Sequence, residues 1–184
     1  MASATSTRAD LVAGAGIAIG GALGMAGTFV ADASVRQTLW AIDGIALVVA
    51  AALLAVRFIR SDEPVVAAGF LVFLAGESLL LSDEAAGLQA SVPSYGGGVA
   101  LWSAALVLVS APAVFPIWAR LTGGVAAVLF AVSAALIFWG EPLLPTAAPL
   151  PSAGYPFLVL TFAGWIWRLF RAAPSSVGAN GPRP

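Results

Sequence analysis

The sequence predicts an all-α, polytopic integral membrane protein with six transmembrane helices. Of its 184 residues, 60% are hydrophobic and only 9% are charged, whereas an ordinary soluble domain is about 25% charged. The mean hydropathy of +0.99 is typical of a polytopic membrane protein. The chain also divides into six apolar segments, most of them close to the roughly 20 residues that cross a membrane as a helix.

Polar and proline-rich stretches separate these segments. Pro64 is expected to begin the third helix, because a missing N–H is tolerated in the first turn. Pro112 and Pro116 shorten or kink the fourth helix, and the first half of a polar connection at 83–98 could form a short interfacial helix. We expect a six-helix transmembrane domain over residues 11–172, with spans at about 11–31, 38–59, 65–82, 99–116, 119–140 and 156–170, a cytoplasmic tail at 1–10 and a disordered cytoplasmic tail at 173–184.

The arginines indicate the orientation of the spans. All of them except Arg36 fall on one side of the predicted membrane, and the positive-inside rule makes that side cytoplasmic, with both termini inside. Tryptophan and tyrosine residues lie near both predicted boundaries, as in the aromatic belts of membrane proteins. The alternative for the first segment is a signal peptide cleaved near Ala31-Asp32-Ala33, although its apolar stretch is long for one. We therefore expect an integral protein of a bacterial inner (plasma) membrane.

The residue types that the chain lacks exclude several kinds of function. It has no histidine, cysteine or lysine, so thiolate or imidazole metal sites, the usual haem ligands, disulfides and histidine-activated nucleophiles cannot form. A net charge of −1 with scattered arginines offers no basic face for nucleic acid. We expect neither enzymatic activity nor a cofactor or bound metal.

Glycines form a stripe on the first predicted helix. They are Gly16, Gly20, Gly24 and Gly27. This spacing puts them on one face of a helix, where small residues let a second helix approach closely. We interpret the stripe as a helix-packing surface, with a ligand groove as the alternative.

Two pairs of short motifs indicate an internal duplication. Leu39-Trp40 recurs as Leu101-Trp102, and Gly76-Glu77 recurs as Gly140-Glu141. These pairs predict that spans two–three and spans four–five are parallel copies of one helical hairpin. Such repeats are common in transporters, where the site often lies between the copies, but a duplication can also be purely architectural.

Two carboxylates lie inside the apolar spans. An acid at the middle of a membrane helix costs roughly 2.5 kcal/mol or more, so it usually faces protein or water and has a partner. Asp43 and Glu77 each lie near the outer end of a span, about 7–8 Å below the outer interface. Arg36 shares a helix face with Asp43 and is the expected counter-ion, and Glu141 is expected at the border of the same site.

Together these residues predict an outward-facing acidic cavity that binds a cation, a proton or a cationic solute; the alternative is a polar clasp that fixes helix register. The first functional hypothesis is a small transport or channel-like protein. Its expected partners are the lipid bilayer and either further copies of itself, in a homo-oligomer, or other membrane subunits. The second hypothesis is a non-catalytic subunit or scaffold that docks through the glycine stripe. The third is a binder of a lipid or another apolar molecule.

Overall fold

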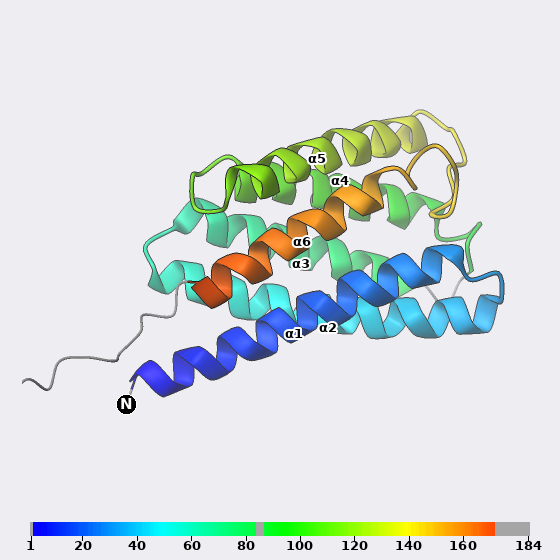
Figure 1. Ribbon diagram of the computed structural model, residues 1–184. Coiled ribbons are helices and arrows are strands. Elements are labelled where there is room, and N and C mark those ends of the chain that lie inside the picture. The colour runs from blue at the N-terminus through cyan, green and yellow to red at the C-terminus, as the bar shows by residue number, and fades with distance from the viewer. Residues whose placement is uncertain (1, 84–86, 172–184) are drawn as a thin grey trace, which may run out of the picture.

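The structure is a computed structural model that describes residues 2–83 and 87–171. These residues form six helices and the connections between them (Figure 1). This confirms the prediction of an all-α protein. The helices are α1 (Ala2–Phe29), α2 (Ala33–Arg60), α3 (Pro64–Asp83), α4 (Val92–Ser110), α5 (Ile117–Phe138) and α6 (Gly154–Arg171). The predicted disordered tail at 173–184 lies outside the described residues, as do residues 84–86 of the predicted polar connection.

The first helices extend beyond their apolar segments. Residues 2–10, expected as a tail, form the first turns of α1. α2 begins soon after α1 ends, because the carboxylate of Asp32 accepts a hydrogen bond of 2.9 Å from the backbone N–H of Val35, an N-cap that starts a helix at this point. α3 begins at Pro64, as predicted.

α4 differs most from the sequence prediction of a span at 99–116. It begins seven residues earlier, about two turns, with Pro93 in its first turn, where proline is tolerated. The glycines that follow pack against other helices instead of forming a loop: a Cβ added to Gly96 would lie 2.7 Å from Cγ2 of Ile137 in α5. α4 then ends before Pro112, so no proline kink forms within it.

The helices form a closed ring, in which each packs against its neighbours in sequence and α1 packs against α6. Figure 1 shows α6 crossing in front of α3 and α4, with α1 and α2 on one side and α5 on the other. Consecutive helices run in opposite directions, so the connections gather at two ends of the bundle. The α1–α2 end also holds the α3–α4 and α5–α6 connections. The α2–α3 end holds the α4–α5 connection, the start of α1 and the end of α6.

The length and composition of the helices support a membrane protein. Among the described residues, α1 to α5 are long and apolar enough to cross a membrane, α1 over Arg8–Phe29. α6 has 18 residues with Arg168 and Arg171 in its last turn, and it is not one of these five. Large apolar side chains also lie exposed on the outside of the ring, for example Leu121 and Val128, each 63% exposed, as expected of surfaces that face lipid.

An aromatic cluster fills the ring toward the α2–α3 end. Its members are Phe58, Phe70, Phe73, Phe115, Phe162 and Trp165. The ring centroids of Phe70 and Trp165 are 4.8 Å apart and those of Phe73 and Trp165 are 5.9 Å apart, within the range of about 4.5–7 Å that favours aromatic pairs. Trp165 and Trp102 are only 3% and 7% exposed. These two tryptophans, expected in the interfacial belts, therefore belong to the interior.

The glycine stripe of α1 lies against α2. A Cβ added to Gly16 would be 2.8 Å from the carbonyl oxygen of Ala46, and one added to Gly27 would be 2.5 Å from Nε1 of Trp40. Both distances are too short for a real side chain, so these positions need glycine at the observed helix separation. A helix of the same chain therefore packs along the stripe.

Candidate functional site

A cavity of about 490 Å³ lies inside the ring at the α1–α2 end. Its wall comes from the C-terminal part of α1, the N-terminal half of α2, the end of α3 and the beginnings of α4 and α6, together with residues 87–91 and Pro145. Five aromatic side chains contribute to this wall: Trp40, Tyr95, Trp102, Tyr155 and Phe162. Below it, toward the α2–α3 end, the aromatic cluster occupies the ring.

The two predicted carboxylates both line this cavity. Asp43 reaches it from α2 and Glu77 from α3, and Glu77 is only 3% exposed. The antiparallel pairing of α2 and α3 lets both side chains reach the same cavity. Tyr155 of α6 lines the same cavity.

Asp43 packs directly against the glycine stripe. A Cβ added to Gly20 would lie 3.1 Å from Oδ1 of Asp43, and a Cβ at Gly24 would collide with Oδ2. No local pattern in the sequence indicates this link, because the stripe and the acid lie on different helices. The missing side chains at these positions leave room for the carboxylate.

Arg36, the predicted counter-ion, lies at the cavity wall. Its guanidinium donates to the carbonyl oxygen of Val30 at 3.0 Å and lies 5.8 Å from the ring centre of Trp40. Arg36 satisfies a backbone acceptor just beyond the end of α1, where helix carbonyls have no partner within the helix.

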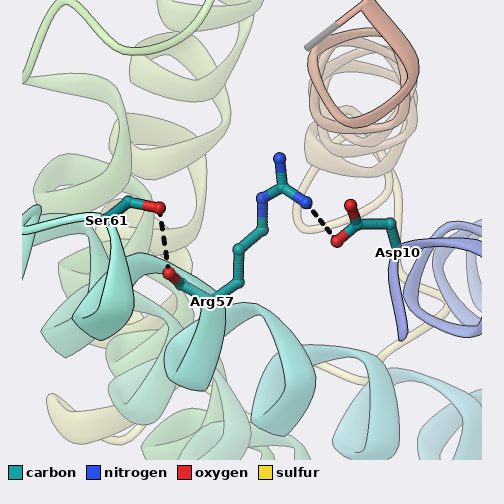
Figure 2. A network of polar contacts seen from close by, with 3 residues as sticks. All are labelled: Asp10, Arg57 and Ser61. Carbon is teal, nitrogen blue, oxygen red and sulfur yellow. Dashed lines mark hydrogen bonds and ion pairs between the residues drawn. The ribbon is translucent and has the colours of Figure 1, made fainter. Parts of the chain in front are cut away.

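Among the described residues, an ion pair joins Arg57 of α2 to Asp10 of α1, at the opposite end of the bundle (Figure 2). Ser61 donates to the backbone carbonyl of Arg57 at 3.1 Å in the same network. Partly exposed pairs of this kind contribute about 0–1 kcal/mol, so this contact orients α1 on α2 rather than providing much stability.

A chain of hydrogen bonds crosses the cavity wall through two tyrosines. The hydroxyl of Tyr155 donates to the carbonyl oxygen of Pro145 at 3.0 Å, and the hydroxyls of Tyr95 and Tyr155 are 2.7 Å apart. A tyrosine hydroxyl has one proton, so Tyr95 is the donor to Tyr155 and keeps only acceptor capacity. The sequence placed both tyrosines in an interfacial belt, and no local pattern indicated that they would meet.

Glu141 lies apart from this site. It is exposed in the α5–α6 connection and is not part of the cavity wall. It follows Gly140, whose φ of 101° ends α5, whereas Gly76 and Glu77 lie within α3. The two Gly-Glu motifs therefore have different structures, while Trp40 and Trp102 of the other repeated motif both line the cavity.

Comparisons with protein-family models, with curated proteins and with solved structures found no match to this chain. The function must therefore be inferred from the cavity itself. A wall of aromatic and aliphatic side chains that contains two carboxylates suits a ligand with a positive charge.

Proposed function

We propose that the protein is a small carrier that binds a cation in the cavity lined by Asp43 and Glu77. In this proposal all six helices cross a bacterial inner (plasma) membrane, with both termini in the cytoplasm. α6 is included because it closes the ring between α5 and α1, and because it buries Leu158, Phe162 and Trp165 in the interior. The arginines at its end would lie in the interface.

The distribution of charge supports an outward-facing cavity. The α2–α3 end holds Arg57, Arg60, Arg120, Arg168 and Arg171, which the positive-inside rule places on the cytoplasmic side. The cavity is at the other end, so it would open to the outside.

The observation that carries the proposal is the pair of acids in one cavity wall, of which Glu77 is buried and Asp43 is partly buried. A carboxylate at this depth is unfavourable in its charged form, and a cation in the cavity would offset that penalty. The aromatic cluster occupies the ring beyond the cavity, which favours a carrier that must change conformation over an open channel. Asp43 and Glu77 would then be the binding residues, with Arg36 at the wall as a structural neighbour.

The other hypotheses have less support. The scaffold hypothesis was based on a free glycine stripe, but α2 fills that stripe. A lipid or apolar-ligand binder could use the same cavity, although the acids would then serve no purpose in recognition. Three further expectations stay predictions: homo-oligomerisation, association with other subunits, and a parallel duplication of α2–α3 and α4–α5. The two cavity-lining tryptophans, Trp40 and Trp102, favour the duplication.

The proposal can be tested by thermal unfolding of the purified full chain with a panel of inorganic and organic cations at constant ionic strength. A ligand that binds the folded state raises its stability, by about 2.7 kcal/mol at a concentration of 100 times Kd. We expect at least one cation to raise the Tm of the wild type and of the control Glu141→Gln, but not of Glu77→Gln or Asp43→Asn. A wild type that responds to no cation, or a response that survives in both cavity variants, would contradict the proposal.

A further inference from the structure

We propose that the ligand of this cavity is a protonated amine with an apolar, preferably aromatic, body; this rests on the proposed function and names its substrate class. The first argument is size. A volume of about 490 Å³ lies within the range of roughly 300–1,000 Å³ that is typical of sites for small organic molecules. A proton or a bare metal ion would leave most of this space empty. Ca²⁺ also takes about 6–8 oxygen ligands, and the carboxylates here stand among aromatic and aliphatic groups.

The second argument is the composition of the wall. Trp40, Tyr95 and Tyr155 come from α2, α4 and α6 and surround the cavity together with Trp102 and Phe162. Aromatic faces attract cations, and several around one cavity are the usual means of binding an organic ammonium group. Leucines at positions 47, 80 and 158 add aliphatic surface, which suits the apolar body of such a ligand.

The third argument is the direction of the hydrogen bonds. The side-chain donors of Thr28, Trp40, Ser91 and Tyr155 all point to backbone carbonyls. Nε1 of Trp102 is buried beneath the cavity surface and has no acceptor among the described residues.

Arg36, Gln37 and Gln89 also line the wall, and beside them the wall presents three acceptor groups to the cavity. These are the carboxylates of Asp43 and Glu77 and the hydroxyl oxygen of Tyr95, whose proton is directed to Tyr155. These acceptors are complementary to the N–H groups of an ammonium ion.

The test is equilibrium binding of radiolabelled 2-phenylethylammonium to the full chain in lipid nanodiscs. Its neutral isostere, 2-phenylethanol, and the small cation tetramethylammonium serve as competitors. We expect saturable binding, with at least about tenfold weaker competition by either compound, because one lacks the charge and the other the apolar body. Glu77→Gln should weaken binding by at least about tenfold, and so should Asp43→Asn, a second variant in case the first does not fold. Glu141→Gln, outside the cavity, should bind as the wild type does.

Equal competition by 2-phenylethanol would overturn the proposal, because it would indicate a pocket selective for apolar bodies alone. Binding that is unchanged in both acid variants would overturn it as well. If an inorganic cation stabilises the protein in a Glu77-dependent manner and 2-phenylethylammonium does not bind, the amine is wrong and the cation-binding function stands. If no cation of either kind has an effect, both proposals fail.

Discussion

At the scale of single residues, the main finding is that the glycine stripe and the carboxylate of Asp43 form one arrangement. Gly20 and Gly24 allow α1 to approach α2, and the same missing side chains make room for both carboxylate oxygens. From the sequence, the stripe could be either a ligand groove or a helix-packing surface. In the structure it packs against α2, and Gly20 and Gly24 also line the cavity.

This arrangement predicts that Gly24→Ala both destabilises the fold and weakens the response to cations. The new Cβ would collide with Oδ2 of Asp43, and overpacking of this kind typically costs about 1–3 kcal/mol. The matched control is Gly124→Ala, because a Cβ there meets nothing within 4 Å. Gly14, although off the stripe, is a poorer control, since its Cβ would lie 3.1 Å from the ring of Phe170. Thermal unfolding of both variants in the same detergent measures the difference, and equal Tm values would show that Asp43 can move away without loss.

At the scale of whole helices, arginines satisfy backbone groups where helices end. Arg120 donates to the carbonyl oxygens of Ser110 and Ala111, both at 2.8 Å, and so caps the end of α4. Arg168 donates to the carbonyl of Val114 in the following connection at 3.1 Å. Carbonyls at a helix end near the membrane need such partners. The arginines that indicate orientation in the sequence thus also hold the α4–α5 connection in place.

We therefore expect Arg120→Gln to lower stability, whereas Arg60→Gln should have little effect. Removing the guanidinium leaves two acceptors at the end of α4 unsatisfied, at a typical cost of about 1–3 kcal/mol where such groups are buried. Arg60 carries the same charge at the same end of the bundle and is exposed. Comparing the thermal unfolding of the two variants distinguishes the loss of the helix cap from the loss of a positive charge. The interpretation of Arg120 as a cap would be wrong if both variants lost the same stability.

Some helix positions and contacts could be predicted from the sequence, and others could not. Hydropathy located α2, α3 and α5 to within a few residues, because their apolar runs are continuous. It misplaced α4, since three glycines in succession resemble a loop until Leu79, Leu80 and Ile137 are seen to pack on them. That Asp43 and Glu77 face a common cavity could be predicted, because each lies near the same end of two consecutive antiparallel helices. The tyrosine pair and the arginine caps depend on contacts between distant segments, which one sequence does not reveal.

At the scale of the whole molecule, the closed ring divides into two halves with different contents. The half at the α1–α2 end contains the acidic cavity, and the half at the α2–α3 end contains the aromatic cluster. The contact between α1 and α6 completes the enclosure. A ligand could therefore enter from one side only while the aromatic cluster stays packed, which is the central claim of the carrier proposal.

Single-cysteine labelling tests this claim most directly, because the chain has no cysteine of its own. Leu80→Cys places a thiol in the cavity wall one turn from Glu77, and Ser61→Cys places one at the exposed α2–α3 turn. Membrane-impermeant methanethiosulfonates, one cationic and one anionic, would be added separately to each side of sealed vesicles.

We expect the thiol at position 80 to react only from the outside, and faster with the cationic reagent than with the anionic one. Adding Glu77→Gln should reduce that preference, while the thiol at position 61 should react only from the inside. Labelling of position 80 from the cytoplasmic side, or equal rates for the two reagents with and without Glu77, would contradict an outward-facing acidic cavity.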